Sequence, residues 1–287
     1  MSAAPVPAPD RTMSDAPWRK AVRQLLRNPT AMIGLGALVL LTIVAIAAPW
    51  LAPHDPIRQN PLMFLKPPSA EHWLGTDQFG RDIFSRILYG SRISLRIGLV
   101  SVGIAIALGG FLGLVSGFYG GWLDQVISRF VDLLLAFPGI LLALVIVSVI
   151  GPSLTNVMIA VGISATPTYA RVVRGSVLAA RENVYVEAAH ALGAGERRIL
   201  ARHVLPNVAI PIVSVLGIQF TYLLGGSVYI EVVFAWPGLG SLLQSAIRDA
   251  DFPLVQAITI FISLFAISIH LLTDLAYGLL DPRLRRA

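Results

Sequence analysis

The sequence predicts an all-α membrane protein with six transmembrane helices and a short cytoplasmic helix between the fourth and fifth of them. Two observations support this fold class. Of the 287 residues, 55% are hydrophobic and only 13% are charged, whereas soluble domains carry about 25% charged residues. Long windows without any Asp, Glu, Lys or Arg also recur along the chain. Such windows suit a bilayer, because a hydrocarbon core about 30 Å thick requires about 20 apolar residues per helix.

The first span is predicted at 31–51, after an N-terminal cytoplasmic tail at 1–30. Residues 1–17 are rich in Ala and Pro and poor in large apolar side chains, so we expect this part of the tail to be disordered. The basic stretch at 18–27 is expected to lie along the inner membrane surface. The apolar run at 31–51 is longer than the roughly 7–15 residues of a signal-peptide core, so we predict an uncleaved span.

Five further spans are predicted from the charge-free windows. They lie between residues 96 and 124, within 132–171 (two spans), between residues 203 and 231, and at 252–273. Gly151-Pro152-Ser153 is the expected turn between the third and fourth spans, since Gly and Pro interrupt helices. These spans form a transmembrane domain at 97–282, which a cytoplasmic tail at 283–287 follows.

The distribution of basic residues predicts that both termini are cytoplasmic, in a cell inner (plasma) membrane. With that orientation, fifteen of the 22 Lys and Arg residues fall on inside segments and seven on outside segments. This excess follows the positive-inside rule, although the external loop at 52–96 carries six of the seven. Within that loop, residues 83–88 place apolar side chains on one face of an expected interfacial helix. The rule also explains the net charge of +6 without a nucleic-acid partner.

The longest polar inside segment, at 171–207, is longer than a connector between two helices requires. Asn183 is expected to be the N-cap of a short helix that contains Glu187-Ala188-Ala189. Gly193 stands where the C′ residue of that helix would lie. Small side chains on one face of this helix would let a partner surface approach closely. The segment is therefore predicted to be a docking surface.

The spacing of residues in this segment resembles the EAA loop of bacterial ABC importer permeases. The resemblance consists of the Glu-Ala-Ala triplet, a glycine after three further residues, and a Leu-Pro pair after a second amphipathic stretch at 196–203. In that superfamily the loop forms a coupling helix that docks in a groove of the ATP-binding subunit. The resemblance implies the ABC importer type I permease fold, and it implies a coupling role for Glu187, Ala188, Ala189, Gly193, Leu205 and Pro206.

Further segments resemble the C-type permease of dipeptide, oligopeptide and nickel importers. They are found at 73–77 (Trp-Leu-Gly-Thr-Asp), 80–82 (Gly-Arg-Asp), 90–95, 119–124 and 281–285. One segment, 231–240, instead resembles the B-type partner of such pairs. The family implies that the chain forms half of the translocation pathway of an ATP-driven importer, with di- and oligopeptides as the expected cargo. Nickel chelates, haem and glutathione-like solutes are the alternatives.

The resemblance also implies the other parts of the transporter. A homologous B-type permease, two ATP-binding subunits and an external solute-binding protein would surround this chain in the lipid bilayer. The chain itself is not expected to be an enzyme, because a P-loop requires Lys followed by Ser or Thr, whereas Lys20 and Lys66 precede Ala and Pro. We therefore expect no cofactor or metal in this chain, with ATP and Mg²⁺ bound by the partner subunits.

An ion-coupled secondary transporter is the main alternative class. Such proteins use ionisable residues near the membrane centre and broken helices. Here Asp132, Glu231, His270 and Asp274 lie toward the ends of the predicted spans, which favours structural roles for them. A membrane enzyme is less favoured, since the sequence shows no nucleophile–base pair or metal cluster.

Glycines are concentrated in the second and fifth predicted spans. Because a glycine lets the backbones of two helices approach closely, we expect these residues to form helix-packing faces. They are Gly103, Gly109, Gly110, Gly113 and Gly117 in the second span and Gly225 and Gly226 in the fifth.

Overall fold

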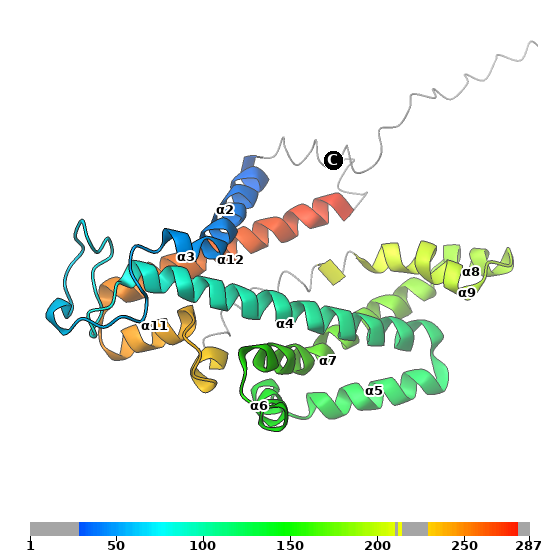
Figure 1. Ribbon diagram of the computed structural model, residues 1–287. Helices are drawn as coiled ribbons and strands as arrows, with labels where there is room; N and C mark the ends of the chain where they lie inside the picture. The colour runs from blue at the N-terminus through cyan, green and yellow to red at the C-terminus, as the bar shows by residue number, and fades with distance from the viewer. Residues whose placement is uncertain (1–28, 210–211, 214–228, 281–287) are drawn as a thin grey trace, which may run out of the picture.

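The computed structural model describes residues 29–209, 212–213 and 229–280, and this part of the chain is helical without a β-strand (Figure 1). The longer helices are α2 (Pro29–Ile46), α4 (Ile83–Tyr119), α5 (Gly121–Leu135), α6 (Gly139–Ile150), α7 (Leu154–Arg181) and α12 (Phe252–Leu280). The shorter ones are α3 (Ala48–Leu51), η1 (Pro61–Met63), α8 (Val184–Ala191), α9 (Glu196–Ile199), η2 (Leu200–Val204) and α11 (Leu239–Arg248). The all-α prediction is confirmed.

Helix α4 is the longest element of the described structure and packs along α7 (Figure 1). It begins at Ile83, where the side chain of Asp82 accepts a hydrogen bond from the backbone N–H of Ser85 and so caps the helix. It ends at Gly120, whose φ of 66° glycine adopts without steric cost. The stretch 83–88, expected as a separate interfacial helix of the external loop, is therefore the first part of α4.

Three glycines bring α4 and α7 into backbone contact. A Cβ atom added to Gly113 would lie 2.6 Å from the backbone oxygen of Ala170, and Gly109 and Gly117 meet α7 at similarly short distances. The packing role predicted for these three is confirmed. For Gly103 and Gly110 it stays a prediction, because an added Cβ at either would meet no atom of the described residues within 4 Å. Gly225 and Gly226 lie outside the described residues.

Helices α5 and α6 meet at an angle of 94°, which the sequence did not predict (Figure 1). The bend falls at the residues just before α6, where Pro138 occupies the N-cap position. Proline disfavours a helical conformation in the residue before it, so the helix cannot continue through this point. Helix α6 has 12 residues and spans about 18 Å at 1.5 Å per residue. The prediction that the third span is one continuous helix is therefore wrong, because the chain bends between α5 and α6.

The predicted turn between the third and fourth spans is confirmed. Gly151 has a φ of 95°, and the hydroxyl of Ser153 accepts a hydrogen bond of 3.1 Å from the backbone N–H of Asn156. The amide of Asn156 donates in return to the backbone oxygens of Ile150 and Gly151. Both ends of the turn are thus satisfied, and α7 begins at Leu154.

Helices α2 and α12, from opposite ends of the sequence, pack against each other (Figure 1). A Cβ atom on Gly34 would lie 2.4 Å from Cβ of Leu271, so a larger residue does not fit there. The apolar run predicted as the first span is divided into α2 and α3. The apolar run predicted as the sixth span lies within α12.

One described helix, α4, is long and apolar enough to cross a membrane alone, and the bent pair α5–α6 adds a second if the pair forms one span. Shorter apolar helices lie at Met32–Ile46 and Phe252–Ser268. The fifth predicted span falls largely on residues outside the described part of the chain.

Candidate functional site

Helix α8 contains the Glu-Ala-Ala triplet and lies beside α9 at the end of the molecule far from α11 (Figure 1). Its N-cap position is Asn183, as predicted, but the side chain of this residue does not cap α8. The amide instead donates to the backbone oxygens of Ala179 and Ala180, at 2.9 Å and 3.2 Å. Asn183 therefore closes the C-terminal end of α7, where unpaired carbonyl groups need donors.

Gly193 ends α8 in the way the sequence predicts. Its φ is 77°, and its N–H donates to the oxygen of His190 at 2.9 Å, while the N–H of Ala194 donates to the oxygen of Ala189 at 3.0 Å. These two bonds form a Schellman motif, which satisfies the last carbonyl groups of a helix and requires a left-handed residue at C′. The chain reverses at this glycine and enters α9.

The triplet divides between an inner and an outer face of α8. Glu187 and Ala188 are exposed, whereas Ala189 is buried. Ala189 belongs to a hydrophobic cluster, here called the loop core, that consists of Phe118, Val173, Val177, Ala180, Val186, Ala189, Ile199, Val204 and Val208. The expectation that the small residues of the triplet share one docking face is therefore wrong for Ala189, because its methyl group packs inward.

The outer face of α8 carries large apolar side chains beside the charged Glu187. Val184 is 79% exposed, and Leu192, just beyond the helix, is 88% exposed. Tyr185 is also exposed. Large apolar side chains that are exposed on one side of a helix, while its other side packs in a hydrophobic core, are typical of a surface that another protein covers.

Beyond α9 the helix continues as a π-helix, η2. The backbone N–H of Leu205 donates to the oxygen of Leu200, five residues earlier. Pro206 follows directly and has no N–H to donate to residue 202, so the local sequence favours the wider helical turn. Leu205 and Pro206 are both exposed. All six residues expected to act in coupling thus lie in one compact segment, of which Ala189 is the buried member.

Comparison with known proteins identifies the family. Residues 109–286 match the family described as "Binding-protein-dependent transport system inner membrane component". This chain belongs to that family. Residues 16–68 match the "N-terminal TM domain of oligopeptide transport permease C". The chain is therefore an ABC importer permease of the C type, as its sequence motifs indicated.

Curated relatives resemble this permease over most of its length. The dipeptide transport system permease protein DppC of Alkalihalophilus pseudofirmus is 43% identical over 82% of this chain and 76% of its own length. The glutathione transport system permease protein GsiD of Pectobacterium atrosepticum is 39% identical over 94% of this chain and 92% of its own length.

Solved structures show the same fold at lower identity. A chain of the inward-facing MetNI methionine ABC transporter has a TM-score of 0.60 and 20% identity, and covers 68% of the permease and 96% of that chain. A chain of an amino acid ABC transporter has a TM-score of 0.58 and 19% identity, and the match covers 71% of the permease and 95% of that chain. The type I permease fold is thereby confirmed.

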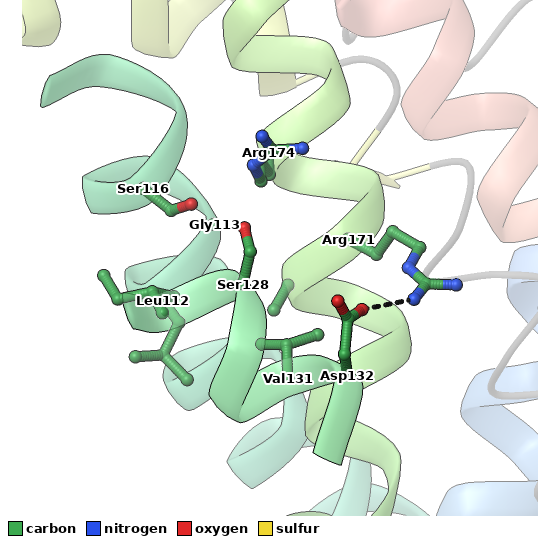
Figure 2. Close-up of a pocket in the computed structure, with 10 residues that line it drawn as sticks. Leu112, Gly113, Ser116, Ser128, Val131, Asp132, Arg171 and Arg174 are labelled. Carbon is green, nitrogen blue, oxygen red and sulfur yellow. Dashed lines mark hydrogen bonds and ion pairs between the residues drawn. The ribbon is translucent and has the colours of Figure 1, made fainter. Parts of the chain in front are cut away.

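A cleft of about 140 Å³ lies between α4, α5 and α7 of the permease (Figure 2). At one end the guanidinium of Arg174 forms two hydrogen bonds of 2.6 Å and 2.7 Å with the carboxylate of Asp124. At the other end Arg171 donates to Asp132 at 2.8 Å. Because both arginines are paired with carboxylates, the cleft presents ion pairs that join helices rather than a free charge.

Glu231 has the structural role predicted for it. Its carboxylate is fully buried and accepts hydrogen bonds from the hydroxyl of Ser94 at 2.6 Å and the N–H groups of Gly240 and Ser241 at 2.6 Å and 3.1 Å. The two N–H groups are at the start of α11, where backbone donors have no partner within the helix. Glu231 therefore holds α11 against α4. The side chain of Asp274 lies outside the described part of the chain, and His270 is exposed.

The loop between α3 and α4, predicted to be external, holds a polar cluster that the sequence did not predict. Within the loop, Asp77 accepts a hydrogen bond of 2.8 Å from the guanidinium of Arg81, and also pairs with Arg86. Gly75 and Gly80 have left-handed φ values of 80° and 67°, which explains the glycines of the Gly-Thr-Asp and Gly-Arg-Asp segments. Beside them, His72 and Asp82 form a buried pair. His72 and Asp82 are ten residues apart in the sequence, and no known motif links residues at that spacing, so the sequence alone did not indicate this pair.

Proposed function

We propose that this permease imports small peptides as half of the translocation pathway of an ATP-driven transporter. The observation that carries this proposal is the 43% identity to a dipeptide permease over most of the chain. The similarity to glutathione permeases supports the same chemical class, since glutathione is itself a tripeptide. Dipeptides are the first candidate substrate, and glutathione-like peptides are the second.

The proposed partners are a homologous B-type permease, two ATP-binding subunits and an external solute-binding protein. ATP and Mg²⁺ would bind to the ATP-binding subunits, because this chain lacks a Lys followed by Ser or Thr for a phosphate loop. The N-terminus, the loop at 171–207 and the C-terminus would face the cytoplasm, in line with the distribution of Lys and Arg.

Helix α8 is the proposed coupling helix. Its exposed residues Val184 and Leu192 would dock on the ATP-binding subunit, with Glu187 and Ala188 beside them. Gly193 sets the turn after the helix, and Leu205 and Pro206 connect the loop to the next span. The packing of Val186 and Ala189 in the loop core supports this role, since a helix that transmits a displacement must be anchored to what it moves.

A path for that displacement follows from the packing. The loop core joins α8 to Val173 and Val177 of α7. Helix α7 in turn touches α4 through backbone contacts at Gly109, Gly113 and Gly117. Because closely packed helices move as one body, closure of the ATP-binding subunits would move α8, α7 and α4 together. This rocking would expose the pathway to each side of the membrane in turn.

Uptake by the reconstituted transporter tests the proposal. The complex with its partner subunits and solute-binding protein would be placed in proteoliposomes with ATP inside, and uptake of labelled dipeptides, glutathione and a nickel chelate would be compared. We expect ATP-dependent uptake of peptides that persists when an ionophore removes the ion gradients. Uptake that needs a gradient and not ATP would show an ion-coupled transporter, and uptake of the chelate alone would overturn the peptide proposal.

A further inference from the structure

Three potential metal ligands converge in the external loop from segments far apart in the sequence. They are the imidazoles of His54 and His72 and the carboxylate of Asp82, and one ligand atom of each lies within 4.8 Å of the other two. His54 follows α3, His72 lies in the middle of the loop, and Asp82 caps the start of α4. The fold, rather than a sequence motif, brings the three together.

The two inner members of this group are held in place by neighbours. The side chain of Asp82 is 0% exposed and that of His72 is 9% exposed. One oxygen of Asp82, Oδ2, accepts hydrogen bonds from the N–H and the hydroxyl of Ser85 at 2.8 Å and 2.7 Å. The other oxygen, Oδ1, faces Nδ1 of His72 at 2.9 Å. Asp82 thus keeps one oxygen directed to His72 while the other caps α4.

His54 is the outer and more adjustable member. Its ring centroid lies 4.6 Å from that of His72, and its backbone N–H donates to the hydroxyl of Ser85 at 3.2 Å. Its Nε2 atom lies 3.0 Å from the backbone oxygen of Glu71, in an exposed hydrogen bond. An exposed hydrogen bond is readily exchanged for another partner, so this ring can turn toward the other two ligands.

We propose that His54, His72 and Asp82 bind a divalent transition-metal ion of the zinc class. Two imidazole nitrogens and one carboxylate oxygen are ligands that zinc uses, and nitrogen ligands disfavour Mg²⁺ and Ca²⁺. Ligand atoms about 2.1 Å from a tetrahedral ion stand about 3.4 Å apart. The separations here, at most 4.8 Å, therefore need to change by about 1.4 Å or less, which a turn of the His54 ring would supply.

The effect of such an ion would be to fasten the external loop. Between α3 and α4 the loop contains the short η1 helix and the isolated bridge between Thr76 and Asp82, and loops with so little secondary structure are uncommon above about 15 residues. The ion would tie the end of α3 to the start of α4. This proposal does not depend on which solute the permease carries, since the ion stays with the chain.

Zinc binding by the full-length chain in lipid nanodiscs tests the site. The chain would carry an affinity tag without histidine, and zinc chloride would be titrated by calorimetry and by thermal unfolding. We expect one zinc ion per chain and a higher unfolding temperature. His54→Ala should weaken binding at least about tenfold and abolish the rise in temperature. Asp82→Asn, which still caps α4, should weaken binding similarly.

A control variant and an alternative zinc ligand elsewhere in the chain complete the test. Asp55→Asn changes an exposed carboxylate next to His54, and it should bind zinc as the wild type does. Binding that survives His54→Ala would come from exposed histidines elsewhere, such as His190, and would overturn the proposal. Absence of zinc binding at micromolar concentrations in the wild-type chain would overturn it too, and would leave His72 and Asp82 as a hydrogen-bonded helix cap.

Discussion

Single residues decide how closely the helices of this permease approach one another. Gly109, Gly113 and Gly117 are spaced four apart, so they lie on one face of α4, and each leaves room for the backbone of α7. Gly103 and Gly110 lie in the same helix but point in other directions, and an added Cβ at either meets no atom of the described residues within 4 Å. In a bilayer, where burial of apolar surface between helices is not favoured over lipid, such close contact is a main source of helix association.

Gly113→Val is expected to separate α4 from α7. The added side chain would meet the backbone oxygen of Ala170 and the Cβ of Val173 at 2.6–2.7 Å, and overpacking of this kind costs about 1–3 kcal/mol. The unfolding temperature of the purified chain should therefore fall. Gly110→Val is the matched control, in the same helix but without a neighbour among the described residues, and it should leave the temperature unchanged. Equal loss in both variants would contradict this assignment.

Glu231→Ala is expected to release the start of α11. The change leaves the N–H groups of Gly240 and Ser241 and the hydroxyl of Ser94 without the carboxylate that they now contact. A buried donor left unsatisfied costs about 1–3 kcal/mol. Hydrogen exchange at residues 239–241 should become faster, and Glu231→Gln should restore part of the protection. Unchanged exchange in the alanine variant would show that α11 is held by other contacts.

At the scale of elements, α8 combines an anchored inner face with an exposed outer face. Val186 and Ala189 pack in the loop core, and the Schellman motif at Gly193 fixes the direction in which the chain leaves. An eight-residue helix is too short to be stable alone in water. Its stability comes from these contacts, which leave the opposite side free for a partner.

Leu192→Asp is expected to uncouple ATP hydrolysis from transport. The side chain is 88% exposed, so the change places a charge on the proposed docking face without disturbing the loop core. Substrate-stimulated ATPase activity and uptake by the full complex should fall together, at unchanged unfolding temperature. Leu62→Asp, at a leucine that is 86% exposed in the external loop, is the control and should keep ATPase activity. Normal uptake with Leu192→Asp would refute the docking face.

On the scale of the whole molecule, the proposed coupling helix α8 and the proposed metal site lie at opposite ends of the described structure. Helices α8 and α9 form one end, beyond the last residue of α7 at Arg181, and the loop between α3 and α4 together with α11 forms the other (Figure 1). Helix α4 connects them, because it begins at the cap made by Asp82 and ends near Phe118 in the loop core. A displacement of α8 can therefore reach the other end of the described structure through one continuous helix.

Cysteine labelling in intact cells would test this orientation. The chain has no cysteine of its own, so single substitutions at exposed positions are clean probes. Ala70→Cys, in the external loop, should react with an impermeant maleimide added outside, whereas Glu182→Cys, in the loop at 171–207, should react only after the membrane is opened. Labelling of Glu182→Cys from outside would invert the proposed topology.

Patterns in the sequence were sufficient for the class of the protein and for the helix-ending signals of the proposed coupling loop. Hydropathy follows directly from side-chain chemistry, and the turn at Gly151, the C′ position of Gly193 and the spacing of the triplet depend on neighbours within a few residues. The predictions for Gly151 and Gly193 are confirmed. The coupling role of the triplet stays a proposal. The sequence pattern was misleading at Asn183, because this residue lies between two helices and its side chain can bond to either. Its amide donates to the end of α7 and does not cap the start of α8.

The sequence by itself determined that the chain is an α-helical membrane permease and where its helix-ending signals lie, because these properties depend on composition and short-range geometry. Only the tertiary structure decided which glycines of α4 touch α7, that Ala189 packs inward, that α5 and α6 meet at a bend, and that His54, His72 and Asp82 lie close together. Each of these depends on the direction in which a side chain points relative to a segment far away in the chain. Such directions follow from the packing of whole helices, and no local pattern records them.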